Sequence, residues 1–174
     1  PWTIAFSPDG AKLAGAFNDG AARVWEVGSG RESLVLKGHK SRATSIAFSP
    51  DGKTLVTGSD DETVKLWEAA TGREQLTILP RSGLIKSVAF SPDGKMIATG
   101  GVGSATARRG DFLVRLWRVG DGKEIVAFDP DGGWSLAFSP DGKMLATASR
   151  DYIRLWDFVS RREIATLRGH NSRI

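Results

Sequence analysis

The chain has 174 residues, with 24 Lys and Arg against 20 Asp and Glu, so its formal net charge is +4 at pH 7. That mildly basic balance is too small to indicate nucleic-acid binding on its own. The lack of cysteine excludes disulfides, thiol nucleophiles and Cys-ligated zinc, and no apolar run approaches the roughly 20 residues of a membrane-spanning helix.

The first residue and the positions of the methionines lead us to expect a longer parent chain. Residue 1 is Pro1, and the only methionines are Met96 and Met144, so we expect a piece or a processed form of a longer protein. No signal peptide is visible. Composition does not separate the cytoplasm from the exterior; the compartment stays open, with the cytoplasm favoured.

One sequence pattern occurs four times along the chain. Each copy contains Ala-Phe-Ser-Pro-Asp-Gly, and the phenylalanines of successive copies are 42, 42 and 48 residues apart. A period of this length is typical of one blade of a propeller. The phenylalanines are Phe6, Phe48, Phe90 and Phe138, and the tryptophans that follow in step are Trp25, Trp67, Trp117 and Trp156.

The second copy is the most regular and defines the predicted elements. Alternating segments at 44–48, 53–59, 63–67 and 74–79 predict four antiparallel strands separated by Gly or Pro turns. In Ser49-Pro50-Asp51-Gly52, proline presets φ, Asp can bond its own backbone, and Gly takes the positive φ that a hairpin needs. The sequence therefore predicts one well-specified hairpin per repeat.

The same reading of all four copies predicts an all-β fold of four four-stranded antiparallel blades in a single segment, 1–174. The blades should lie at about 1–37, 38–79, 80–128 and 129–170. The third copy carries an insertion at 102–110, between its second and third strands. We expect the glycine-rich stretch 100–104 to be a flexible loop and not a phosphate cradle, because Lys-Ser/Thr does not follow. We expect 129–133 to be a tight turn and not a calcium loop.

Gly-His, Ala-Phe-Ser-Pro-Asp-Gly, Ser-x-Asp and Leu-Trp-Glu or Leu-Trp-Asp, taken together, resemble the WD-repeat β-propeller family. The resemblance covers essentially the whole chain, and the repeat sequence is more similar to the repeats of bacterial members than to those of eukaryotic ones. It implies that a hydrogen-bonded chain of Trp, Ser or Thr, His and Asp stabilises each blade. The one full match to that tetrad is His39, Ser59, Asp61 and Trp67.

The same residues have the composition of a hydrolase triad. That alternative needs an exposed nucleophile and a Gly-x-Ser-x-Gly elbow, whereas the repeat places Ser59 inside a strand. With only His39 and His170 in the chain, a metal site has little to build on. We expect no enzyme activity, no cofactor and no metal.

Three repeats depart from the full tetrad. In the first, Phe17 stands at the serine position beside Asp19, and in the third Arg109 holds that position. The fourth has Ser149 and Asp151, but Asp129-Pro130 stands in its histidine region. We expect these three blades to depend more on apolar packing.

The family resemblance also implies where partners bind. Three positions per repeat face the rim of the ring, at six and four residues before the phenylalanine and one before the structural Asp. They transfer to Arg42, Thr44 and Asp60; Leu84, Lys86 and Gly110; Gly132, Trp134 and Arg150; and Trp2 with Asn18.

Within that set we expect a contact surface containing Trp2, Trp134, Arg42 and Arg150, with Arg108 and Arg109 added from the insertion. Trp and Arg are favoured interface anchors. One alternative is that both tryptophans fill the central channel as core; another is that the Arg pair is an ordinary solvated loop.

Four blades alone would form an open arc with two bare blade faces, because this family usually has seven or eight blades. The cost of leaving each face bare, at about 25 cal/mol/Å², is on the order of 10 kcal/mol. We therefore expect half of an eight-bladed ring that a second copy completes, with His170 of each copy near Asp19 and Trp25 of the other. The alternative is that the rest of a longer parent chain closes the ring.

The sequence thus favours a non-enzymatic scaffold that binds a protein or peptide on a propeller face. One alternative is a regulatory or targeting module of a larger enzyme such as a kinase or protease. Another is weak nucleic-acid binding through basic loops, whose affinity would fall steeply with salt. A membrane partner is not expected.

Overall fold

The computed structural model describes residues 1–80, 83–102, 114–128, 133–149, 151–157, 160 and 162–169. These residues contain sixteen strands and no helix, so none of the described segments is a helix that could cross a membrane. The all-β prediction is confirmed.

The strands form four four-stranded antiparallel sheets in which neighbours in sequence pair in space. We number these sheets as blades 1 to 4. Blade 1 comprises β1 (Thr3–Phe6), β2 (Lys12–Ala16), β3 (Ala22–Glu26) and β4 (Glu32–Leu36). Blade 2 comprises β5 (Ala43–Phe48), β6 (Thr54–Ser59), β7 (Val64–Glu68) and β8 (Glu74–Ile78). Blade 3 comprises β9 (Leu84–Phe90), β10 (Met96–Val102), β11 (Val114–Arg118) and β12 (Glu124–Phe128). Blade 4 comprises β13 (Ser135–Phe138), β14 (Met144–Ala148), β15 (Tyr152–Asp157) and β16 (Arg162–Arg168).

The Ser-Pro-Asp-Gly turn joins the first two strands of every blade by the same contacts. In blade 2 the Ser49 hydroxyl donates to Asp51 Oδ1 at 2.6 Å, and that oxygen accepts from the Lys53 amide at 3.0 Å. Gly52 has φ of 70°, the left-handed region that glycine enters without strain. The hydroxyl bond lowers the pKa of Asp51. The other three turns repeat the Ser–Asp bond at 2.6 Å.

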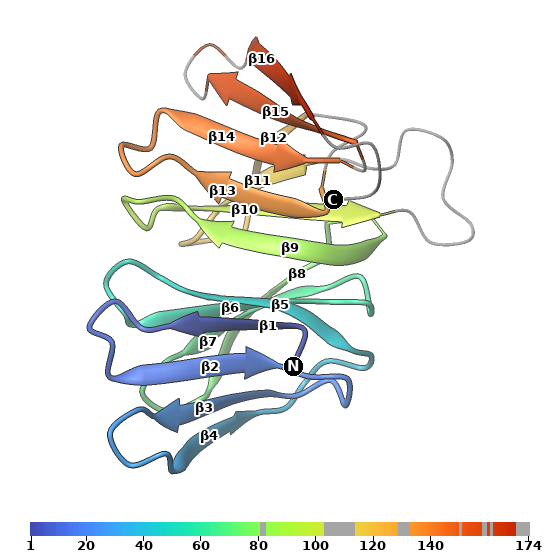
Figure 1. Cartoon of the computed structure of the whole chain (residues 1–174). Coiled ribbons are helices and arrows are strands. Elements are labelled where there is room, and N and C mark those ends of the chain that lie inside the picture. Colours follow the sequence, from blue (N-terminus) through green and yellow to red (C-terminus); the bar gives the residue numbers. More distant parts are fainter. Residues whose placement is uncertain are drawn as a thin grey trace.

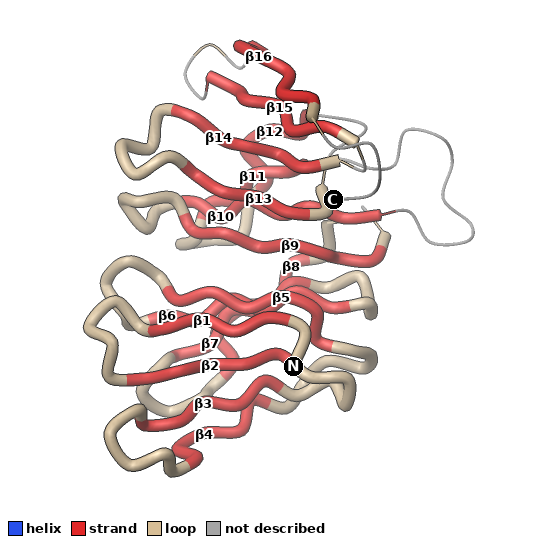
Figure 2. The backbone as a smooth tube through the Cα atoms, in the orientation of Figure 1, coloured by secondary structure: helices blue, strands red, loops and turns tan. Residues whose placement is uncertain are grey.

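The blades are arranged as a fan around their first strands. β1 packs beside β5, β5 beside β9, and β9 beside β13. In Figure 1, blade 1 extends from β1 to β4 in one direction and blade 4 extends from β13 to β16 in the opposite direction, while blades 2 and 3 recede behind them. Figure 2 shows the turns of all four blades gathered at the two ends of the strands. Loops there lie near one another although they are distant in sequence.

The hydrophobic core lies between blades. One cluster joins Val24 of blade 1 to Leu55 and Trp67 of blade 2. A second joins Val56 and Leu66 of blade 2 to Ile97 and Trp117 of blade 3, and a third joins Leu116 of blade 3 to Leu145 of blade 4. Each blade therefore presents the face bearing its tryptophan to the preceding blade. We call this face the Trp side, and the other the opposite side.

The glycine-rich stretch of the third repeat departs from its prediction. Gly100, Gly101 and Val102 were predicted to begin a flexible loop, but they belong to β10. A Cβ on Gly100 would lie 2.5 Å from Gly133 Cα. Glycine is needed there because two backbones approach closely. The rest of the predicted loop, from residue 103, and residues 129–132 of the predicted turn lie outside the described residues.

Candidate protein-binding site

A hydrogen-bonded chain holds the tryptophan of blade 2, and it runs through a different residue from the one predicted. Trp67 Nε1 donates to Thr57 Oγ1 at 2.8 Å, and Thr57 Oγ1 lies 2.7 Å from His39 Nε2. His39 Nδ1 then lies 3.1 Å from Asp61 Oδ2. Thr57 thus takes the place that the predicted tetrad gave to Ser59.

Strand register explains this correction. Leu55 is directly opposite Trp67 and Thr57 is directly opposite Lys65, so Thr57 lies one diagonal step from the indole on the same face. Ser59 shares that face but stands at the end of β6. Its hydroxyl donates to the Ser41 carbonyl at 3.3 Å and accepts from the Asp61 amide at 3.0 Å. Ser59 therefore orders the loop that carries Asp61.

Other blades repeat the Trp–Thr bond. Trp117 Nε1 donates to Thr99 at 2.8 Å, and Trp156 Nε1 donates to Thr147 at 3.0 Å. The serine position predicted at Arg109 is therefore not needed in blade 3, because Thr99 supplies the hydroxyl. Arg109 itself lies outside the described residues.

Burial sets the protonation of the network in blade 2. It disfavours the imidazolium and lowers the pKa of His39, against the attraction of Asp61. Burial also raises the pKa of Asp61, but hydrogen bonds from Thr63 and the Lys40 amide, together with His39, outweigh it and leave that pKa lowered. The network therefore consists of a neutral histidine and a carboxylate at neutral pH.

The hydrolase alternative finds no support in these contacts. Ser59 is fully buried, and the His39 ring bonds Thr57 and Asp61. A serine nucleophile has to be reachable by substrate and bonded to its base. Among the described residues, no group of three or more His, Cys, Asp or Glu side chains is arranged to hold a metal ion.

A pocket of about 310 Å³ opens where the first strands of the blades meet, and side chains of all four blades line it. Thr3 completes the lining. It was not among the predicted residues, because the positions that the family resemblance implies do not include the residue after Trp2. The predicted partner-binding residues that line this pocket are Trp2, Arg42, Thr44, Asp60, Lys86 and Trp134.

Asp60 organises the charges of the pocket. Its side chain is 5% exposed, and Oδ2 lies 2.6 Å from an Arg42 guanidinium nitrogen while Oδ1 lies 2.6 Å from Lys86 Nζ. Two cations thus surround one carboxylate, which leaves an excess positive charge. Arg42 remains half-exposed, so it can reach a partner. The ion pair of Asp60 with Lys86 also crosses from blade 2 to blade 3.

The two tryptophans of the pocket are open to solvent. Trp2 is 57% exposed and Trp134 is 46% exposed in the single chain. The Arg42 guanidinium carbon lies 5.5 Å from the centre of the Trp2 ring, within cation–π range. Thr44, which also lines the pocket, donates a hydrogen bond to the Ile85 carbonyl of blade 3 at 2.6 Å.

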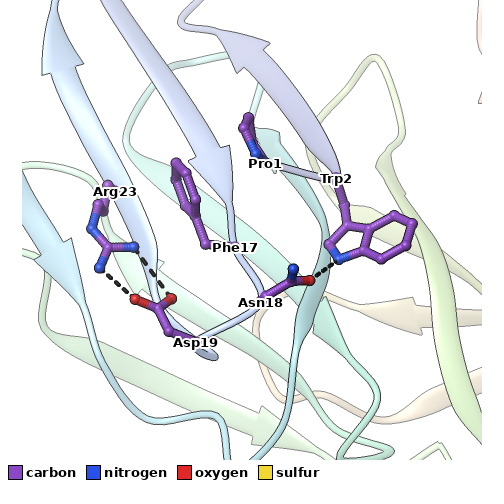
Figure 3. Close-up of a pocket in the computed structure, with 6 residues that line it drawn as sticks. All are labelled: Pro1, Trp2, Phe17, Asn18, Asp19 and Arg23. Carbon is purple, nitrogen blue, oxygen red and sulfur yellow. Dashed lines mark hydrogen bonds and ion pairs between the residues drawn. The ribbon is translucent and has the colours of Figure 1, made fainter.

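A second pocket lies beside the first, on the Trp side of blade 1 (Figure 3). The indole nitrogen of Trp2 donates to Asn18 Oδ1, which orients the ring between the two pockets. Asp19 is bonded by the Arg23 guanidinium, which lowers the pKa of that carboxyl to about 2. Asn18 therefore positions Trp2 and does not line the first pocket.

The remaining predicted residues are placed less favourably or not described. Leu84 is half-buried at the start of β9 and pairs with Val102, away from the pocket lining. Arg108, Arg109, Gly110, Gly132 and Arg150 lie outside the described residues, as does His170.

Comparison with known protein families decides the identity of the repeat. The model of the WD domain, G-beta repeat, matches residues 1–26, 30–68, 73–118 and 130–157. The chain belongs to the WD40 repeat family. The second and third WD40 matches each begin before the last strand of one blade and end with the third strand of the next, so repeat and blade are offset there. WD40 repeats are generally protein-interaction modules and are typically non-enzymatic.

One relative is an uncharacterized WD repeat-containing protein, alr3466, from Nostoc sp. (strain PCC 7120 / SAG 25.82 / UTEX 2576). It is 46% identical over 43 residues, which is 25% of this chain and 3% of the relative. This WD40 chain therefore matches only a small part of that protein's length.

Proposed function

We propose that the chain is a protein-binding scaffold whose docking site is the rim pocket of Trp2, Thr3, Arg42, Thr44, Asp60, Lys86 and Trp134. The convergence of side chains from four blades on one pocket carries this proposal. The blades are rigid sheets, so the pocket is formed before a partner arrives and little conformational entropy is lost on binding.

The lining specifies the chemistry of the partner. The exposed indoles of Trp2 and Trp134 offer apolar, flat surfaces that gain free energy when a partner covers them. The excess positive charge of Arg42 and Lys86 over Asp60 favours an anionic group. A protein segment with an apolar side chain next to an Asp or Glu matches both features.

The scaffold also requires cover for its outermost blades. We infer that a second copy of the chain completes the ring to eight blades, as the sequence predicts. In the family such a ring presents its rim as one continuous surface, with the pocket at its centre.

Selection from a library of random peptides tests the docking site. Peptides chosen on the wild type should combine apolar and acidic residues, and Trp134→Ala should weaken their binding about tenfold or more in fluorescence anisotropy. Arg73→Ala is the matched control, because Arg73 is exposed far from the pocket. Peptides that bind Trp134→Ala as tightly as wild type would exclude this pocket as the site.

The same titrations at several salt concentrations separate a peptide from a nucleic acid. Peptide binding that depends on both indole and charge should weaken only moderately as salt screens the cations. Binding of an oligonucleotide with a steep salt dependence, and no selected peptide, would favour the nucleic-acid alternative.

A further inference from the structure

The three contacts between neighbouring blades are copies of one interface. In each, the opposite side of one blade packs on the Trp side of the next. Residues at the same position in each repeat can therefore be compared directly. The described residues form four Trp sides and four opposite sides but three such contacts, so one side of each kind is left over among them.

The residue two positions before the repeat phenylalanine lies on the Trp side, so its exposed fraction shows whether that side is covered. It is Ile46 in blade 2, Val88 in blade 3 and Leu136 in blade 4, which are 5%, 6% and 8% exposed. In blade 1 the same position is Ile4, which is 60% exposed. Phe6 beside it is exposed as well. The Trp side of blade 1 is thus built from interface residues that nothing in the described chain covers.

A residue in the last strand of each blade lies on the opposite side, and its exposed fraction shows whether that side is covered. Leu36 of blade 1 and Ile78 of blade 2 are 1% and 4% exposed, and each is paired with the start of the neighbouring third strand. The residue in this position of blade 4 is Leu167, opposite Ile153, and it is 50% exposed. Blade 4 therefore presents the complementary half of the same interface.

Polar contacts follow the same repetition. Ser45 Oγ accepts from the Val88 amide at 3.1 Å across blades 2 and 3, and Ser87 Oγ accepts from the Leu136 amide at 3.1 Å across blades 3 and 4. Ser135 is the next residue of this series and is exposed. A further contact of the same kind would place its hydroxyl opposite the Ile4 amide of a second copy.

The turns repeat the pattern too. Pro8 Cδ lies 3.6 Å from where a Cβ on Gly52 would stand, and Pro50 and Pro92 meet Gly94 and Gly142 in the same way. A Cβ on Gly10 would have no described atom within 4 Å. Gly10 therefore lacks the proline contact that Gly52, Gly94 and Gly142 have. The equivalent proline of blade 4, Pro140, is exposed.

We propose that the opposite side of blade 4 packs on the Trp side of blade 1 of a second copy, and the reverse, so that two head-to-tail contacts close a ring of two chains. This rests on the ring put forward under the proposed function and names its residues: Leu167, Ser135 and Pro140 of one copy face Ile4, Phe6 and Gly10 of the other. A second copy fits because the two open faces are complementary to each other and not to themselves. A two-fold rotation relates the two contacts, because each joins blade 4 of one copy to blade 1 of the other.

Light scattering of the whole chain tests the ring. The wild type should have twice the mass of one chain of 18.7 kDa. Ile4→Asp and Leu167→Asp should each raise the dissociation constant at least about tenfold and give single chains, because each places a charge in both contacts. Both residues are at least half exposed in one chain, so the substitutions should leave its fold intact, which circular dichroism checks. Phe6→Asp, also on an exposed side chain, serves if Ile4→Asp does not fold.

Val35→Asp is the matched control. Val35 is 38% exposed on the last strand of blade 1, and its counterpart in blade 2, Thr77, is exposed and belongs to none of the clusters between blades. This variant should keep the doubled mass.

A mixture of the Ile4→Asp and Leu167→Asp variants gives the most specific test of the ring. One of its two contacts holds both substitutions and the other holds neither, so the mixture should regain the doubled mass while each variant alone remains single. A monomeric wild type, a mixture that stays monomeric, an unaffected Leu167→Asp or a mass that grows beyond two chains would each overturn the proposal. Trp134→Ala, which tests the peptide pocket, should keep the doubled mass, so the two proposals fail separately.

Discussion

Blades 1 and 2 hold the same tryptophan by different means. In blade 2, Trp67 is buried and donates to Thr57, which His39 and Asp61 extend into a network. In blade 1 the residue equivalent to Thr57 is Gly15.

Aromatic packing replaces the hydroxyl in blade 1. The ring of Phe17 lies edge-on to Trp25, with centroids 5.9 Å apart, and the Arg23 guanidinium carbon lies 4.9 Å from the centre of the Phe17 ring. Asp19, the counterpart of Asp61, is bonded by Arg23 on the surface. A fully satisfied polar network is stronger where water is excluded. Blade 1, whose flank is open in the single chain, uses aromatic packing and an exposed ion pair instead.

The largest effect should come from the central hydroxyl of blade 2. Thr57→Val keeps the shape of the side chain but leaves the buried Trp67 N–H and His39 without their common partner. We expect a loss of about 3 kcal/mol in the free energy of unfolding, measured by urea denaturation.

Thr99→Val in blade 3 is the matched comparison, because its hydroxyl serves Trp117 without a described histidine. It should cost about half as much. Equal losses in the two blades would mean that the His39 and Asp61 bonds add nothing to the Trp–Thr bond.

Restoring the hydroxyl to blade 1 should destabilise it. A Cβ on Gly15 would lie 3.1 Å from the Phe17 ring, so Gly15→Thr is expected to cost about 1–2 kcal/mol by overpacking. Adding Phe17→Ser should recover most of the loss. Gly28→Thr controls for the change of residue type, since a Cβ there meets open space. A stable Gly15→Thr would show that Phe17 is free to move.

The pH dependence of stability should differ with and without His39. Its pKa is lowered in the fold from an ordinary value of 6.5, so the unfolded chain takes up a proton that the folded chain refuses. Stability is then fully present above about pH 6.5 and declines as pH falls toward the lowered folded pKa.

Urea midpoints at about pH 7.5 and about pH 5.5 measure this decline. His39→Gln should be less stable at both pH values but lack the decline. A decline that persists in His39→Gln would assign it to another group.

The smallest effect should follow from the exposed ion pair of blade 1. Asp19→Asn, measured in the single chains of the Ile4→Asp variant, removes the charge that Arg23 pairs with. Both groups face water there, and salt screens the attraction. We expect the urea midpoint to stay close to that of Ile4→Asp alone, whereas Asp61→Asn in blade 2 should lower it clearly. Equal effects would contradict the distinction between the two blades.

Repeated sequence made the fold predictable. The recurrence of Ser-Pro-Asp-Gly before each second strand specifies four hairpins, because each of its residues has a separate task in the turn. The family resemblance implied the rim positions, and three of them, Trp2, Arg42 and Trp134, meet in one pocket because equivalent positions of a radial repeat converge.

Contacts that depend on exact register were not predictable. Thr57 and Ser59 lie on one face of one strand, both with hydroxyls, and only the pairing of β6 with β7 decides which one meets Trp67. The ion pair of Asp60 with Lys86 crosses two blades, and no pattern within a single repeat encodes it.

The serine hydroxyls that bond the next blade's backbone occupy the same position in successive repeats. This bond therefore depends on position in the repeat and not on which of these repeats meet. Duplication of either serine-bearing unit would preserve it at the new junction. Genes for such chains can grow by entire units over evolutionary time without inventing a new interface.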